Sequence, residues 1–348
     1  MEAEVLKQAL GIDVAKNTLA VCLGTLKPDL EKEFAVLGEV ANDPSGFQAI
    51  TGWLSKLKVQ KEKVAVVLEA TGVYHEALAV YLHQKGYPVS VMQSGRVKRY
   101  AQSLDQRSKT DALDSRMLAM LGCERKLASW SPPDRALRQL KGLSRERSFL
   151  LKERNAEKNR LHAAETAAYS NKNEIKRFAR RLRLLEEQVK EVEQEMRDLV
   201  AADEQLAQKM RYLESIPGVS FLSAATVVGE TCGFKEISSA KQLTSYAGYD
   251  VVLKESGSFR GSTKISKKGN KHIRSMLHMP SMAAIRVNPT LKVFYQRLKP
   301  NKAKPIVALV AVQRKLLLLM YSLYKNNEFY TPLPQQKAAR ALSPCCAG

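Results

Sequence analysis

The sequence predicts an α/β domain with a mixed sheet, then long connecting helices, then a mainly helical C-terminal domain. Three observations support this order. Short apolar runs typical of strands alternate with helical segments over the first 130 residues. Residues 134–213 contain Gly142 and no proline, which favours long helices. A glycine- and serine-rich basic segment at residues 255–274 then lies among short helical runs.

The N-terminal elements are expected in the order strand, strand, strand, helix, strand, helix, strand, helix. The ranges are 8–16, 19–23 and 34–37 for the first three strands, a helix ending near residue 57, a strand at 64–69, a helix at 74–85, a strand at 88–92 and a helix at 111–125. Meandering strands followed by alternating elements predict a mixed sheet with helices packed on it.

Four acidic residues occupy defined positions on these elements. Asp13 lies in the first strand, Glu69 ends the fourth, and Asp111 and Asp114 share one face of the closing helix because they are three residues apart. Close carboxylates repel each other unless a cation neutralises them, and magnesium binds such oxygens. This is the layout of a ribonuclease-H-like fold, in which two Mg²⁺ ions about 3.5–4 Å apart assist phosphodiester chemistry.

Simpler interpretations of the same residues stay open. Asp111 and Asp114 could belong to a solvated helix face, Glu69 could lie beside a helix N-cap, and Asp13 could cap a hairpin. Lys16, Arg107 and Lys109 are predicted to hold the DNA backbone near the acids. A solvated basic face would explain these three cations equally well.

The formal charge is +21, from 56 Lys and Arg against 35 Asp and Glu. Such a surplus predicts a polyanionic partner, with nucleic acid favoured over an anionic membrane surface. The most apolar stretch, residues 306–324, is interrupted by polar residues at 313–315, so no membrane span is expected. The N-terminus lacks a signal-peptide pattern, and the five cysteines show no metal-ligand spacing. A cytoplasmic protein with reduced thiols is therefore expected.

The segment from residue 131 to 213 is expected to form two long helices with a break near residues 169–173. Apolar residues of the second recur at steps of three and four, interrupted only by Asp203, which is a coiled-coil pattern. That helix would be nearly 60 Å long at about 1.5 Å per residue. The seam could be buried within a helical hairpin or in an interface between subunits, so a homo-oligomer is expected.

The C-terminal domain begins near Pro217-Gly218, which could form a phosphate-binding turn between helices or a plain turn. Farther on, glycines at 257, 261 and 269 permit close approach of a ligand to the backbone. The cations of this segment, which predict a phosphate-binding loop, are Arg260, Lys264, Lys267, Lys268, Lys271 and Arg274. A serine here is a weak nucleophile unless a base or metal activates it, and composition selects none of them.

Taken together, these stretches resemble the DEDD transposases of the insertion-sequence-110 family. The matching pieces, in family order, are Gly-Ile-Asp13-Val-Ala-Lys, Leu-Glu69-Ala-Thr-Gly-Val-Tyr, Lys-Thr-Asp111-Ala-Leu-Asp114-Ser-Arg-Met, Ser-Ile-Pro217-Gly-Val, Tyr-Ala-Gly248-Tyr, Glu-Ser256-Gly-Ser and Ile-Ser-Lys-Lys-Gly269. The resemblance implies a RuvC-like DEDD catalytic domain (1–130), a coiled-coil connector (131–213), a C-terminal transposase domain (214–330) and a flexible tail (331–348).

The resemblance also implies a mechanism. Asp13, Glu69, Asp111 and Asp114 would bind Mg²⁺, and Ser256 would match the family's proposed nucleophile. The acids and the serine, brought from different subunits of a dimer or tetramer, would form one composite site and a phosphoserine–DNA intermediate. A structured non-coding (bridge) RNA would select donor and target DNA by base pairing. The expected location is the bacterial cytoplasm, at the nucleoid.

Two small departures from the family pattern concern Ser115, where alanine is common, and the Cys345-Cys346 tail. We expect the serine to be neutral, and the tail has no counterpart. Two other functions stay open. A junction-resolving nuclease would use water and dispense with Ser256, and a nucleic-acid-binding scaffold would bind without magnesium and break no strand.

Overall fold

The computed structural model describes residues 5–332 except 71, 105–109, 133, 253–254, 257–258, 261–263 and 301–304, and only the backbone at 255, 256, 259 and 260. Contacts divide the chain into two compact units, Met1–Pro132 and Pro133–Gly348. Each unit is described separately below. Arg107, Lys109, and residues 333–348 of the expected tail, with its two cysteines, lie outside the described residues.

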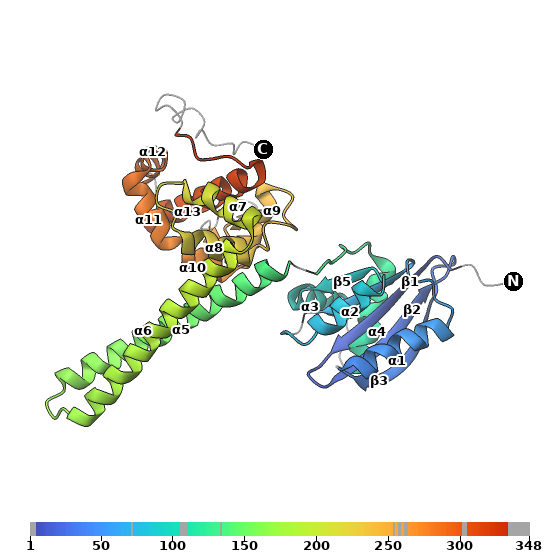
Figure 1. The fold of residues 1–348 in the computed structure, drawn as a ribbon. Helices are drawn as coiled ribbons and strands as arrows, with labels where there is room; N and C mark the ends of the chain where they lie inside the picture. Colours follow the sequence, from blue (N-terminus) through green and yellow to red (C-terminus); the bar gives the residue numbers. More distant parts are fainter. Residues whose placement is uncertain are drawn as a thin grey trace. The chain divides into compact units, whose positions relative to one another are not determined.

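The N-terminal unit is a five-stranded mixed sheet covered by helices (Figure 1). Its elements are β1 (Lys7–Val14), β2 (Thr18–Leu26), β3 (Lys32–Ala41), α1 (Pro44–Lys56), β4 (Val64–Glu69), α2 (Glu76–Gln84), β5 (Val89–Met92), α3 (Ser94–Ser103) and α4 (Asp111–Glu124). The strand order is β3-β2-β1-β4-β5, antiparallel from β3 to β1 and parallel from β1 to β5. The mixed sheet fits the expected ribonuclease-H-like domain, and the element order departs from the expected one by the added helix α3 between β5 and α4.

Opposite faces of this sheet carry different helices. Leu10, Ile12 and Val14 point to one face because alternate residues of a strand share a side, and they pack with residues of α1 and α2. Val67 points to the other face and packs with α3 and α4. The burial of both faces explains why β1 and β4 are almost continuously apolar, as is typical of central strands.

The edge strand β3 is longer than the sequence predicted. It runs from Lys32 to Ala41, whereas residues 34–37 were expected. Most of its side chains are exposed or half-buried, so the strand lacks the apolar pattern that marks the central strands. Helix α1 begins where the sequence indicated, because Asp43 caps it by accepting a hydrogen bond from the Gly46 amide at 2.9 Å and Pro44 occupies its first turn.

The C-terminal unit combines a long helical hairpin with a helical bundle. Its helices are α5 (Arg135–Thr166), α6 (Lys172–Ala201), α7 (Glu204–Glu214), α8 (Phe221–Glu230), α9 (Ala240–Ala247), α10 (Lys271–Met276), α11 (His278–Val287), α12 (Pro289–Leu298) and α13 (Pro305–Asn326). Between α9 and α10 lie the short strands β6 (Val251–Val252), β7 (Glu255–Ser256), β8 (Phe259–Arg260) and β9 (Lys264–Ile265).

Helices α5 and α6 lie side by side and form the hairpin alternative of the sequence interpretation (Figure 1). The predicted seam of α6 is buried at Val189, Val192 and Met196, and these residues join the same core as the bundle. Toward the hairpin tip, Ile175 and Phe178 are only half-buried. Coiled-coil packing itself, and pairing with a second subunit, stay predictions.

The expected 60 Å helix is two helices. Asp203, which interrupts the apolar seam, starts α7 by accepting a hydrogen bond from the Leu206 amide at 3.0 Å. An aspartate at this position is an N-cap, which satisfies an amide at the start of a new helix. Helix α6 therefore spans 30 residues, or about 45 Å at 1.5 Å per residue.

Helix α13 is long and apolar enough to cross a membrane by composition, contrary to the expectation that no segment would be. One side of it is buried in the bundle, at Val312, Leu316, Leu317 and Met320 among others. The polar residues at its centre do not interrupt this face, since Gln313 is buried and accepts a hydrogen bond from the Tyr249 hydroxyl at 3.0 Å. The apolar composition of α13 is therefore explained by its place in the core.

Candidate active site

The position of Asp13 follows from the contact between β1 and α4. Gly11 and Asp13 share one face of β1, two residues apart. A Cβ atom on Gly11 would lie 2.1 Å from the Ser115 carbonyl oxygen and 2.2 Å from the Ala119 amide nitrogen. Gly11 thus allows the α4 backbone to rest directly on β1. Asp13, on the same face, therefore points to the side of the sheet that α4 covers.

The direction of α4 brings its first turn to Asp13. Near the C-terminal end of this helix, a Cβ atom on Gly122 would lie 2.6 Å from the Ala9 Cβ and 2.8 Å from a Val67 methyl group. The helix therefore runs from the carboxyl end of β1 toward Ala9, antiparallel to that strand. Its first turn carries Asp111 and Asp114, which consequently reach the region beyond Gly11.

Glu69 reaches the same region from the neighbouring parallel strand. The register of β1 and β4 pairs Gly11 with Val67 and Ile12 with Leu68. Asp13 and Glu69 are the next residues along the two strands, so both occupy carboxyl ends and project to one face. Ligands of open α/β sheets commonly bind at these strand ends.

The other three carboxylates are close enough to Asp13 to change its ionisation. The pKa of Asp13 is raised to about 6, first by burial and then by the negative charges of Asp114, Asp111 and Glu69. Glu69 and Asp114 are half-buried and Asp111 is exposed. The structure therefore brings together the acids that the sequence singled out, and it makes the charged form of Asp13 unfavourable in the absence of a cation.

The carboxylate oxygens fit a hard divalent cation chemically, because Mg²⁺ prefers oxygen ligands and compensates clustered negative charge. As placed, no three His, Cys, Asp or Glu side chains of the described residues are gathered tightly enough to hold one ion. The fit therefore rests on the donor type and on the unfavourable charge of Asp13. The membership of each acid in a metal site stays a prediction.

A structural role accounts for part of the same sequence. Thr110 caps α4 by accepting a hydrogen bond from the Leu113 amide at 3.2 Å, and both aspartates lie in the first turn. Negative charge at a helix N-terminus is stabilising by about 0.3–1 kcal/mol. This effect explains acids on α4 but not the half-buried Asp13 and Glu69 beside them. Ser115 is buried, and its hydroxyl donates only to the Ala112 carbonyl at 2.9 Å.

The segment that carries Ser256 contains two short antiparallel strand pairs, β6 with β9 and β7 with β8, which are together called the ribbon below. Val251 pairs with Ile265 at its base, and Ser256 pairs with Phe259 near its tip, both antiparallel. Ser256 is thus the last paired residue before a two-residue connection. Its side chain, like that of Arg260, lies outside the described residues.

The other predicted nucleic-acid contacts divide into two groups. Lys16 is exposed just beyond β1, three residues after Asp13, and the exposed lysines of the basic segment are Lys264, Lys267, Lys268 and Lys271. Arg274 differs from them, because its guanidinium donates to the Ala247 carbonyl at 2.8 Å. This arginine therefore stabilises the end of α9 in addition to any contact with a ligand.

A groove of about 760 Å³ lies beside the basic segment, between α5, α8, α10 and α11. Lys152 and Lys271 line it together with Gly218 and Ser220 of the predicted phosphate-binding turn. Gly218 itself has a left-handed backbone, with φ +99°, and a Cβ atom there would lie 2.6 Å from the Ala284 amide nitrogen. The glycine is therefore required for packing of this turn on α11.

Comparisons with known proteins cover both units. The DEDD transposase model of insertion element IS110 matches residues 10–168, and the model of the IS116/IS110/IS902 transposase family matches residues 210–296. Together they include the four acids, helix α5 and the segment that carries Ser256. The chain belongs to the IS110 family of transposases. It is accordingly a DNA transposase or recombinase.

Individual relatives of this IS110-family chain include the pilin gene-inverting protein of Moraxella lacunata. That protein is 26% identical over 328 residues, which are 92% of this chain and 97% of the relative. An uncharacterized protein of insertion element IS116 from Streptomyces clavuligerus is 23% identical over 45% of this chain and 38% of its own length. Among solved structures, Thermus thermophilus RuvC with a Holliday junction substrate matches 32% of this chain and 90% of its own, with 12% identity and a TM-score of 0.24.

One polar network of the IS110-family chain escaped the sequence analysis. Glu230 is completely buried at the end of α8, where Arg145 of α5 binds it through two hydrogen bonds of 2.7 and 3.0 Å. The Asn270 amide donates to the same carboxylate at 2.7 Å, and Asn270 also caps α10. Burial alone would raise the pKa of Glu230, but the hydrogen bonds from Arg145 and Asn270 outweigh it and lower the pKa.

This network fixes the start of α10, because Asn270 both caps that helix and donates to Glu230. Gly269 packs against protein backbone there, since a Cβ atom would lie 2.5 Å from the Tyr246 carbonyl oxygen. Packing is therefore a sufficient reason for glycine at this position, and close approach of a ligand to Gly269 stays a prediction. The signals available in the sequence were the charged Glu230 at the end of an apolar helix and the cap-forming Asn270 before another.

Proposed function

We propose that this transposase cleaves and exchanges DNA strands at a composite site made from its four acids and Ser256. The observation that carries the proposal is the crowding of Asp13, Glu69, Asp111 and Asp114, which makes ionised Asp13 unfavourable in a family of DNA transposases. Structural carboxylates are ordinarily paired with cations. A cluster of negative charge at strand ends that raises the pKa of one of its members is typical of a metal-dependent phosphoryl-transfer site.

The acids would hold Mg²⁺, as two ions in the family arrangement. Asp13 and Glu69 would act from the strand ends, and Asp111 and Asp114 from the first turn of α4. When bound, magnesium neutralises phosphate charge and activates the attacking oxygen. The close packing of α4 on Gly11 supports this arrangement, because it brings the first turn of α4 to the end of β1.

Ser256 would supply the attacking oxygen. Its Oγ forms a bond to a backbone phosphorus while one P–O bond of the DNA breaks, so the reaction is a transesterification. The hydroxyl releases its proton, and the leaving DNA oxygen takes up one. The phosphoserine bond preserves the phosphodiester for exchange with a second strand. A position near the tip of a ribbon would expose the serine to DNA.

The partners would be donor and target DNA together with a structured non-coding RNA. The charge of +21 supports a polyanionic partner. Pairing with a guide RNA would remove the need for a base-reading motif in the protein. Lys16 would contact backbone near the acids, and the lysines of the basic segment would contact it near the ribbon. Two subunits or more would combine the acids of one chain with the serine of another, in the cytoplasm at the nucleoid.

Covalent trapping tests this proposal. The full chain is mixed with Mg²⁺, the element's flanking transcript and end-labelled junction DNA, and a denaturing gel shows whether label migrates with protein. We expect an adduct with wild type, and no adduct with Ser256→Ala or Asp111→Asn. Ser258→Ala is the matched control, because it removes a hydroxyl two residues away and should leave the adduct.

A mixture of the two single variants separates the composite site from a site within one subunit. Ser256→Ala and Asp111→Asn chains combined in one sample should recover part of the adduct if acids and serine come from different subunits. Cleaved DNA without an adduct, unaffected by Ser256→Ala, would contradict the serine mechanism and establish the hydrolytic nuclease. Binding with no strand breakage under any condition would establish the scaffold.

A further inference from the structure

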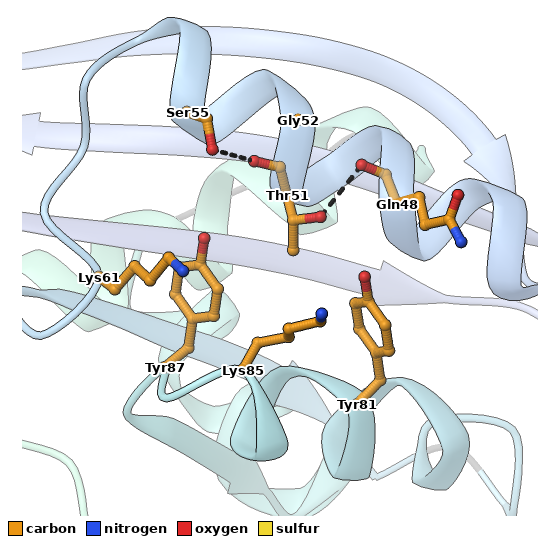
Figure 2. A pocket seen from close by; sticks show the side chains of 8 residues that line it. All are labelled: Gln48, Thr51, Gly52, Ser55, Lys61, Tyr81, Lys85 and Tyr87. Carbon is orange, nitrogen blue, oxygen red and sulfur yellow. Dashed lines mark hydrogen bonds between the residues drawn. The ribbon is translucent and has the colours of Figure 1, made fainter.

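The N-terminal unit contains a cavity of about 270 Å³ between α1 and α2. It lies on the face of the sheet opposite to α4, because α1 and α2 pack on Leu10 and Ile12 whereas α4 packs on Gly11. Figure 2 shows Gln48 and Thr51 projecting from α1 toward two tyrosines and two lysines on the other side. The lining includes no acidic side chain.

The two lysines are held by aromatic rings rather than by carboxylates. Lys61 Nζ lies 6.0 Å from the centre of the Tyr87 ring, and Lys85 Nζ lies 5.7 Å from that of Tyr81. Neither ammonium group has an ion-pair partner within the part of the chain that the structure describes. A cation held over a ring keeps its N–H groups available, so both lysines can donate to an anion in the cavity.

Tyr87 adds a hydroxyl donor that lines the cavity. The residue as a whole is buried, with 3% of it exposed, and no hydrogen bond to another described residue occupies its hydroxyl. In Figure 2 the hydroxyl groups of Tyr81 and Tyr87 both point toward α1, into the space between the helices. Burial, with smaller effects from Tyr81 and Glu62, raises the pKa of Tyr87, so its hydroxyl stays protonated and can donate.

The hydroxyls of α1 are already committed as donors. Thr51 donates to the Gln48 carbonyl at 3.1 Å, and Ser55 donates to the Thr51 carbonyl at 2.9 Å (Figure 2). The donors that remain available come from Lys61, Lys85, Tyr87 and Tyr81. A set of converging donors with two positive charges and no carboxylate matches an oxyanion with several acceptor oxygens.

We propose that this cavity binds one phosphate group of a nucleic-acid strand. The choice of a nucleic acid rests on the proposed function, which supplies this polyanion, while the choice of phosphate rests on the donors. Because the cavity and the four acids lie on opposite faces of one sheet, the phosphate held here is not the one under attack. The cavity is an anchoring site that fixes a strand on the N-terminal unit.

The test measures binding of the full chain in the presence of a chelator, where no strand is cut. Fluorescence anisotropy is recorded with single-stranded DNA and with RNA of the same sequence, over a range of salt concentrations. Inorganic phosphate serves as the probe for a free anion. The variants are Lys85→Gln and Tyr87→Phe. Their matched controls are Lys56→Gln, an exposed lysine at the end of α1, and Tyr169→Phe, which is almost fully exposed.

We expect Lys85→Gln to weaken binding of one strand type on the order of tenfold, and to reduce the slope of log affinity against log salt by about 0.7. Tyr87→Phe should weaken the same strand about fivefold without changing the slope, since it removes a hydroxyl and no charge. The two controls should stay within about twofold of wild type. Whichever of DNA or RNA responds is the strand that the cavity holds.

Equal effects of Lys85→Gln and Lys56→Gln, with no effect of Tyr87→Phe, would overturn the proposal. The proposal would also be overturned if these variants bound inorganic phosphate more weakly than wild type but bound both strands as well as wild type. Tyr87→Phe keeps the buried ring, and unchanged thermal unfolding would verify that its effect is local. Loss of strand cleavage in the trapping experiment would leave this result intact, so the two proposals fail separately.

Discussion

Asp13 and Glu230 are carboxylates withdrawn from water, and their pKa values shift in opposite directions. Glu230 is enclosed by Arg145 and Asn270, and its pKa is lowered although its side chain is completely buried. Asp13 is less buried, yet its pKa rises to about 6, first because of burial and then because of the negative charges of three further acids. Burial raises the pKa of both carboxylates, and at Glu230 the hydrogen bonds from Arg145 and Asn270 outweigh it. The hydrogen-bonded arrangement of Glu230 stabilises the fold, and the clustered acids around Asp13 favour binding of a cation.

Removing the partner of Glu230 should give the largest effect on stability. Arg145→Met would leave a buried carboxylate with Asn270 as its remaining side-chain donor, so we expect the free energy of unfolding to fall by about 3 kcal/mol. This value is at the lower end for a broken buried pair, because the Arg145 side chain is 47% exposed and water can reach part of the site. Urea denaturation of wild type and variant measures the loss.

The matched control for that prediction is the double variant Arg145→Met with Glu230→Gln. It removes the unpaired charge, so it should be more stable than Arg145→Met alone. If the double variant is the less stable of the two, Arg145 acts through packing of its side chain rather than by compensating Glu230. The contrast between the two acids would then lose its electrostatic basis.

The close contact between Gly11 and α4 brings Asp111 and Asp114 to the region of Asp13. Gly11→Ala would place a methyl group 2.1 Å from the Ser115 carbonyl oxygen, so α4 must move away from β1. We expect a cost of about 2 kcal/mol in unfolding free energy and a large loss of strand cleavage. Ser115→Ala is the control on the facing residue, and it should stay within about 0.5 kcal/mol because its hydroxyl bonds only to its own helix. Equal effects of the two substitutions would contradict the close contact.

The difference between these regions also explains what the sequence could and could not predict. Asp13, Glu69, Asp111 and Asp114 were found because strand ends and helix starts have local signals, and the family resemblance places acids there. The partnership of Glu230 with Arg145 joins residues 85 positions apart, and no local pattern specifies it. Gly11 carried a usable signal, since a glycine inside a strand often marks close backbone approach. Asp203 carried another, as a helix cap, and was interpreted only as an interruption of the seam.

The smallest predicted effect tests whether the crowding of Asp13 is relieved by metal. The folded-state pKa of about 6 lies above the ordinary value of 3.8, so the protonated carboxyl stabilises the fold at low pH. That contribution is lost as pH rises through about 6, which disfavours the folded state at neutral pH. Asp13→Asn cannot ionise, so in chelator it should be more stable than wild type by about 1 kcal/mol at pH 8.

The same advantage of Asp13→Asn should shrink at about pH 5, where Asp13 of wild type is largely protonated. Added Mg²⁺ should shrink it at pH 8 as well, by stabilising wild type more than the variant. Thermal unfolding of both proteins under the three conditions measures this difference directly. An advantage that is independent of pH and unaffected by Mg²⁺ would mean that Asp13 is neither crowded nor a ligand. Because carboxylates away from the four acids are common to both proteins, the difference isolates the cluster around Asp13, on which the contrast with Glu230 depends.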